Sequence, residues 1–185
     1  RQAPKVILVG ELRDRESLEC ALKAAETGHL VMSTLHTQNA GQTINRILGM
    51  FDESEERLIR QRLAGSLAGV ISQRLIPDAD GRRVAAFEVM TSSLRTREIM
   101  LRGETPDRTF AGVMEQEADC GMQTFDQHIA GLFADGRIDG EGERLVERRQ
   151  KNFLRWKTGA DQLLAEFFTT GFFTVSQKDP AHRRQ

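Results

Sequence analysis

The chain has 185 residues, of which 39% are hydrophobic and 29% are charged, and its formal net charge is -1 at pH 7. This composition excludes an intrinsically disordered chain, and no apolar stretch approaches the roughly 20 residues of a bilayer-crossing helix. The near-balance of acidic and basic residues gives no global electrostatic reason to expect nucleic acid as a partner.

Cysteine usage and the first residues favour a cytoplasmic protein. Cys20 and Cys120 are the only cysteines and form no C-x-x-C pair. A zinc site is therefore disfavoured, and a reducing compartment is the simplest interpretation. The opening residues show no signal-peptide pattern. Because the chain opens without Met, directly in a strand-like run, we expect it to be a piece of a longer protein.

The first 35 residues have the pattern of a strand, a helix and a second strand. Residues 6–9 are apolar and β-branched, as expected of a central strand buried on both faces of a parallel sheet. From Glu16, apolar residues recur at helical spacing, and Gly28 stands where a C-cap glycine belongs. Residues 30–35 are a second apolar run, so a βαβ unit is predicted.

The middle of the chain predicts two helices and a hairpin. Residues 40–48 have helical spacing, and an acidic capping signature at residues 52–55 leads into apolar positions that continue to Ile71. The second of these should be the longest helix. A proline and glycine turn cluster then joins two strand-like runs, residues 74–76 and 83–89.

Short helices are predicted beyond residue 90, at residues 98–101, 109–117 and 125–133. The expected architecture is an α/β layer followed by a small helical bundle. Aromatic residues then concentrate from residue 151 to the end of the chain.

Glu11 is the first candidate for chemistry. It follows an apolar strand and Gly10, and ligands of open α/β sheets bind at the carboxyl ends of strands. A Walker B element has this form, in which the acidic residue helps to hold Mg²⁺ or polarises the attacking water. The alternative is an ordinary solvated strand end.

His36 is the second candidate, because it follows the next predicted strand and should meet Glu11 above the sheet. A histidine there could donate a hydrogen bond to a phosphoryl oxygen or detect a γ-phosphate. The alternative for His36, and for His29 at the other end of that strand, is that each bonds local backbone.

Taken together, these motifs resemble a known family. Residues 4–14, 24–31 and 34–37 closely resemble the Walker B and histidine-box signatures of the type II/IV secretion ATPase superfamily. Further segments resemble its type IV pilus retraction branch, the twitching-motility ATPases: residues 70–75, 87–90 and 121–126.

The resemblance implies the C-terminal half of a RecA-like P-loop core, working as a homo-oligomeric ring of six or a mixed ring with a paralogue. Such a motor binds ATP and Mg²⁺ and acts on the type IV pilus machinery at the inner membrane. By motif, Glu11 and His36 would be catalytic. Arg13 and His29 would join them in binding nucleotide. Glu11 would also bind the magnesium ion, directly or indirectly. Asp14 would complete the Walker B box with Arg13.

Several family features are missing. The sequence has no G-x-x-x-x-G-K-[ST] motif, so the backbone cradle and lysine that hold phosphates are absent, as are the acidic box and sensory domain that would precede residue 1. Residues 94–104 are only loosely similar to a short helix of retraction motors, which favours an accessory paralogue. A truncated, non-catalytic ring-joining module is the main alternative. A type II secretion or pilus assembly ATPase is disfavoured because such proteins commonly carry a four-cysteine zinc insertion.

Three regions are predicted: residues 1–90 as half of the motor core, residues 91–150 as a helical subdomain, and residues 151–185 as an aromatic-rich extension. The extension matches nothing recognised in the family. It is interpreted as a hydrophobic edge that docks on the domain or on a neighbouring subunit, and Trp156 with its basic neighbours suggests a membrane-surface role as the alternative.

Overall fold

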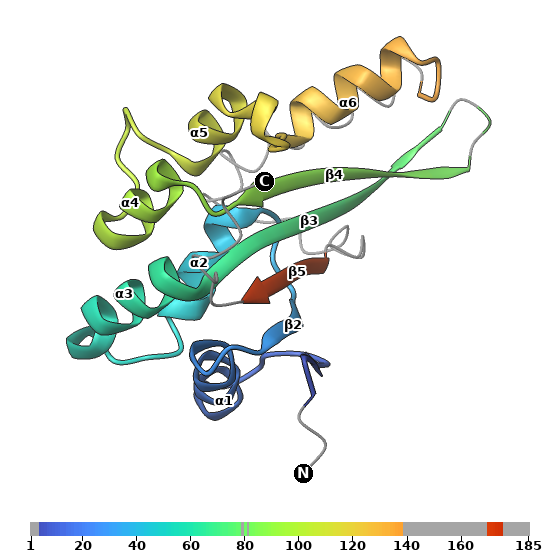
Figure 1. Cartoon of the computed structure of the whole chain (residues 1–185). Coiled ribbons are helices and arrows are strands. Elements are labelled where there is room, and N and C mark those ends of the chain that lie inside the picture. The colour runs from blue at the N-terminus through green and yellow to red at the C-terminus, as the bar shows by residue number, and fades with distance from the viewer. Residues whose placement is uncertain (1–3, 79, 81, 139–169, 176–185) are drawn as a thin grey trace, which may run out of the picture.

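The computed structural model describes residues 4–78, 80, 82–138 and 170–175, and for the last six only the backbone. A five-stranded sheet in the order β1-β2-β5-β3-β4 runs through it, with the helices distributed around the sheet (Figure 1). The strands are β1 (Val6–Val9), β2 (Leu30–Leu35), β3 (Leu67–Pro77), β4 (Arg83–Thr91) and β5 (Thr170–Val175). The α/β class predicted from the sequence is confirmed. None of the described helices is long and apolar enough to cross a bilayer.

The predicted βαβ unit is confirmed. Strands β1 and β2 pair in parallel, and α1 (Arg15–Glu26) connects them. The apolar stripe of α1 is buried, and Gly28 follows the C-cap with a φ of 94°, a conformation that glycine adopts without strain.

Strand β1 is not the central strand that its apolar sequence predicts. Among the described residues it pairs only with β2, so it forms one edge of the sheet. Ile7 and Val9 pack against the core, whereas Val6 and Leu8 point to the opposite face and are 52% and 75% exposed. An apolar run shows that a strand is suited to burial, but it does not reveal how many neighbours the strand has.

Helix α2 spans Ala40–Leu48, as predicted. The prediction that the next helix is the longest is wrong. After the short 3-10 turn η1 (Glu53–Glu55), helix α3 spans Glu56–Ser66 and is one residue shorter than α1. The chain then enters β3 at Leu67. Residues 67–71 keep helical spacing in sequence, but pairing of β3 with both β4 and β5 satisfies their backbone groups as a strand.

The hairpin of β3 and β4 is confirmed and longer than predicted, with register from Gly69 opposite Thr91 to Pro77 opposite Arg83. Its alternating positions divide the side chains between two faces. One face includes the buried residues Val70, Ser72, Glu88 and Met90.

Helices dominate after the hairpin, as predicted: α4 (Leu94–Arg102), α5 (Phe110–Gln116), the 3-10 turn η2 (Ala118–Cys120) and α6 (Phe125–Ala134). Ser93 and Thr124 cap α4 and α6 with reciprocal capping boxes. Helix α6 packs along β4 through a second apolar cluster that includes Ile76, Ala86 and Phe125.

Strand β5 was not predicted. Residues 170–175 enter the middle of the sheet antiparallel to both β2 and β3, which agrees with docking of the aromatic extension on the domain. The rest of the extension, including Trp156 and its suggested membrane-surface role, lies outside the described residues.

The close packing of the hairpin generates a stability prediction at Gly69. A Cβ added there would lie 2.8 Å from the Met90 carbonyl oxygen, whereas one added at Gly65 in α3 would meet nothing within 4 Å. We expect Gly69→Ala to lower the free energy of unfolding by about 1–3 kcal/mol, because backbone must move. The matched control Gly65→Ala should raise it by about 0.5–1 kcal/mol. Urea unfolding followed by circular dichroism measures both, and equal effects would contradict the packing argument.

Candidate active site

Glu11, Arg13 and His36 meet beyond the carboxyl ends of β1 and β2. The His36 Nε2 atom lies 3.2 Å from Glu11 Oε1, and the Arg13 Nε donates to Glu11 Oε2 at 2.6 Å. Each carboxylate oxygen therefore has its own cationic or polar partner. The structure brings three of the four predicted site residues together in one chain.

Backbone contacts fix the two strand ends against each other. The Leu12 N–H donates to the Thr34 carbonyl oxygen at 3.1 Å, and the Thr34 hydroxyl donates to the Gly10 carbonyl oxygen at 2.6 Å. Leu12 is buried in the core, so the loop that carries Glu11 is anchored on both sides. Thr34 thus has a structural role, because it joins the ends of β1 and β2.

The electrostatics of this group favour an ionised Glu11. The hydrogen bond from the Arg13 guanidinium is the largest influence and lowers the pKa of Glu11, opposed by some desolvation and assisted by His36. The Arg13 side chain is 76% exposed and that of His36 61%, whereas that of Glu11 is only 22% exposed. The ion-pair partner of Arg13 is therefore Glu11.

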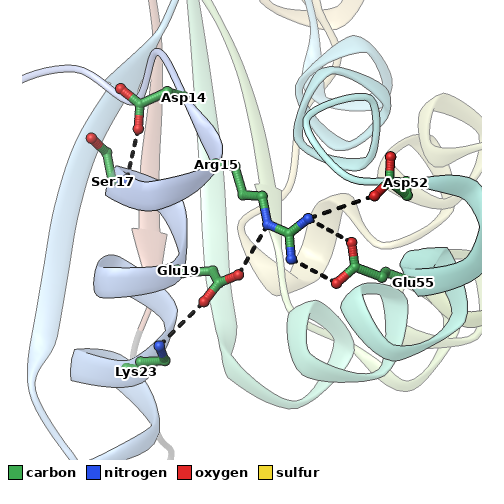
Figure 2. Close-up of polar contacts among 7 residues, drawn as sticks. All are labelled: Asp14, Arg15, Ser17, Glu19, Lys23, Asp52 and Glu55. Carbon is green, nitrogen blue, oxygen red and sulfur yellow. Dashed lines mark hydrogen bonds and ion pairs between the residues drawn. The ribbon is translucent and has the colours of Figure 1, made fainter.

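Asp14 and Arg15 hold the start of α1 directly after this loop. The Asp14 carboxylate caps the helix by accepting from the Ser17 N–H at 2.8 Å. Arg15 reaches away from α1 and donates through both terminal nitrogens to Glu55 at 2.7 Å, while its Nε bonds Glu19 (Figure 2). The sequence analysis missed the Arg15–Glu55 pair, because only the Arg15–Glu19 spacing along one helix is visible in sequence.

His29 does not join the site within its own chain. It precedes β2, whereas His36 follows it, and seven residues of extended chain span about 23 Å. Its Nδ1 lies 3.0 Å from the Ala24 carbonyl oxygen and 3.1 Å from the Thr27 hydroxyl, at the end of α1. The structure therefore gives His29 the local backbone contact that was its alternative interpretation.

The described residues suit a magnesium ion only in a limited way. No group of three His, Cys, Asp or Glu side chains gathers as a metal site in the part of the chain that the structure describes. Magnesium at phosphate-transfer sites is commonly held by one or two carboxylates, waters and the phosphates themselves, so a single ionised Glu11 is compatible with that mode. Glu11 could then contact the ion or one of its waters.

A strand-end carboxylate beside a strand-end histidine, on parallel strands joined by a helix, is compatible with a RecA-like nucleoside-triphosphatase core, and the comparisons with known proteins show this class. A solved structure of the pilus retraction motor PilT with bound ADP superposes with a TM-score of 0.63 and 38% sequence identity, covering 76% of this chain and 39% of that one. Residues 1–127 match the family model described as Type II/IV secretion system protein. The chain belongs to this family.

Two curated relatives from Pseudomonas aeruginosa extend the likeness. The chain is 41% identical to the type IV pilus retraction ATPase PilT over 153 residues, covering 83% of this chain and 44% of PilT. It is 34% identical to the type IV pilus ATPase PilU over 192 aligned residues, covering 100% of this chain and 49% of PilU. The chain thus spans less than half the length of either relative. Because the PilU alignment covers residues 151–185 as well, the expectation that this extension has no counterpart in the family is wrong.

The contact between Arg13 and Glu11 generates a prediction about pH. In Arg13→Met the pKa of Glu11 should rise towards its ordinary value, because the largest stabiliser of the carboxylate is gone. Since the wild-type pKa is lowered on folding, Glu11 contributes stability above its unfolded pKa that is lost as pH falls through the folded one, and the variant should lose part of that contribution. Carbon-13 NMR titration of the Glu11 carboxyl measures the shift. Lys23→Met, which removes a surface partner of Glu19, is the control and should leave Glu11 unchanged.

Proposed function

We propose that this chain is the C-terminal part of a cytoplasmic ATPase motor that drives retraction of type IV pili. The observation that carries the proposal is the meeting of Glu11 with His36 at the strand ends, in a chain 41% identical to PilT over 153 residues. ATP and Mg²⁺ are the proposed ligands. The motor is proposed to work as a ring, of six copies or mixed with a paralogue, beside the pilus machinery of the inner membrane.

In the proposed reaction, the ionised Glu11 orients the attacking water or a water of the magnesium ion. Arg13 keeps the carboxylate charged, and His36 holds its other oxygen while presenting an exposed ring to the γ-phosphate. The sequence lacks a phosphate-binding loop, so the β- and γ-phosphates would be held mainly by polypeptide outside this chain. His29, about 23 Å along the strand, would reach nucleotide only at a junction with another subunit.

A second candidate function is a ring member that transmits force without turning over nucleotide. A sequence without G-x-x-x-x-G-K-[ST] is compatible with it. Separately, the alignment with PilU covers 100% of this chain, against 83% for PilT, which favours a PilU-like protein over the main motor. Both candidates place the chain in the same machine, and they differ in whether Glu11 supports catalysis.

A chimaera tests the proposal at Glu11. The chain is joined behind the part of Pseudomonas PilT that it does not match, and ATP hydrolysis is measured with and without Glu11→Gln. We expect the chimaera to hydrolyse ATP, the 185-residue chain alone to be inactive, and Glu11→Gln to lower kcat by about 100-fold or more with nucleotide binding retained, since the amide keeps shape and removes charge.

Glu19→Gln, on the exposed side of α1, is the matched control and should keep kcat. An inactive chimaera that binds nucleotide normally would favour the force-transmitting module. An unchanged kcat in the Glu11→Gln chimaera would show that Glu11 has no catalytic role and is an ordinary solvated residue at a strand end.

His36 is expected to couple hydrolysis to motion. In the chimaera, His36→Ala should abolish most twitching in a strain that lacks PilT, while ATP affinity stays within a few-fold, because one neutral hydrogen bond contributes only about 0.5–1.5 kcal/mol. Twitching zones on agar and fluorescent-nucleotide titration measure the two effects. His29→Ala is the comparison at the far end of β2. Normal motility in His36→Ala would refute coupling, and a large loss of affinity would make His36 a binding residue instead.

A further inference from the structure

Glu88 is a buried acidic residue in the segment of residues 87–90, to which the sequence analysis assigned no chemical role. It lies on β4, opposite Ser72 of β3, and is 6% exposed. Its Oε1 atom accepts the Ala40 N–H at 2.7 Å and lies 3.3 Å from the Ser72 hydroxyl. Burial raises the pKa of Glu88, and these two bonds and the charge of Arg74 oppose that rise. Burying a carboxylate costs free energy unless it is hydrogen-bonded, and the bonds from Ala40 and Ser72 offset part of this cost.

The Ala40 N–H belongs to the first residue of α2, where helix amides lack partners within the helix. Asn39 caps the same end by accepting from the Gln42 N–H at 2.8 Å. Glu88 therefore adds a second, longer-range anchor, which ties the start of α2 to the β3–β4 hairpin rather than to its own sequence.

Arg74 holds the same loop from the same hairpin. Its Nη2 donates to the Gln38 carbonyl oxygen at 3.3 Å, while its guanidinium lies 4.1 Å from the ring centroid of Phe125 in α6. The hairpin thus contacts the backbone at Gln38 and again at Ala40, two residues on.

The loop fixed in this way begins at His36. Thr37 is buried and its hydroxyl bonds that of Thr43 at 2.7 Å, so the turn from β2 into α2 is held inside the core. The His36 side chain remains largely exposed, with its Nε2 near Glu11. The direction of the His36 side chain therefore depends on backbone that the hairpin holds.

We propose that Glu88 is a positioning residue, which holds the start of α2 so that His36 meets Glu11, and that Arg74 supports it. This rests on the proposed function of His36 and Glu11. A purely structural Glu88 would affect stability alike throughout the fold and would leave His36 unchanged.

The first test uses the 185-residue chain itself. In Glu88→Ala the Ala40 amide should exchange with deuterium about tenfold faster or more, because its one partner is lost, and the ring-proton NMR signals of His36 should shift. Glu88→Gln keeps an acceptor oxygen of the same reach and should restore both. His29, which bonds the Ala24 carbonyl oxygen at the end of α1, is the internal reference. Ile99→Val removes one methyl group from the buried core in α4 and should change neither the Ala40 exchange rate nor the His36 signals.

The second test measures catalysis in the PilT chimaera. Glu88→Ala should lower kcat about tenfold or more at a nearly unchanged KM for ATP, and Glu88→Gln should recover most of it. Unchanged His36 signals in Glu88→Ala, or a Glu88→Gln variant as defective as Glu88→Ala, would overturn the positioning role. If Glu88→Ala does not fold, Arg74→Met is the second variant: it removes the Gln38 and Phe125 contacts and the charge near Glu88 but keeps the Glu88 side chain. It should show the same His36 shift to a smaller extent, and no shift would overturn the positioning role too.

The two tests separate this inference from the proposed function. A chimaera without ATPase activity before any substitution would contradict the proposed function, while the His36 signals would still decide the role of Glu88.

Discussion

The site depends on the parallel pairing of β1 with β2. Their register places Val9 opposite Ser33, so both strands end at the same edge of the sheet, and the bonds of Thr34 with Leu12 and Gly10 continue the pairing past the last ladder residue. Glu11 and His36, which are 25 residues apart in sequence, are side by side for this reason. Antiparallel pairing, or a register shifted by two residues, would separate them by several ångströms.

Two side-chain contacts of different strength hold the elements that follow Glu11 and His36. On one side, Arg15 joins α1 to Glu55 through an exposed bidentate contact, which salt weakens and which contributes little by itself. On the other side, Glu88 binds the start of α2 in the protein interior, where screening is weak and an unmade bond is costly. Of these two side-chain contacts, the one that Glu88 makes at the start of α2 is therefore the less sensitive to salt.

Local signals predicted most of the fold. The helix that begins after Asp14 and the strand at residues 30–35 follow from spacing, capping and the glycine at position 28. The long helix was wrong because Leu67, Val70 and Ile71 continue the spacing of Leu63, and only pairing with distant strands makes them part of β3. Strand β5 has no periodic pattern that marks it, and its place between β2 and β3 is set by contacts with residues more than 90 positions away.

The site was predictable to a similar degree. Glu11 and His36 could be identified because each directly follows an apolar strand, and Arg13 because it belongs to the same motif. The partners of Glu55 and Glu88 could not be identified, because a contact between residues 40 or 48 positions apart leaves no mark in local sequence. His29 lies apart from Glu11 within this chain because strand length, rather than motif membership, sets which end of β2 a histidine occupies.

The uncovered side of β1 and β2 affects how the isolated chain behaves in solution. Val6, Leu8, Met32 and Ile71 are each between 39% and 75% exposed, and β1 offers unpaired backbone groups along one edge of the described sheet. Apolar surface beside a free strand edge favours edge-to-edge association of copies. Purified alone, the chain should bind hydrophobic dyes and form oligomers as its concentration rises, so dilute samples and light scattering belong in any study of it.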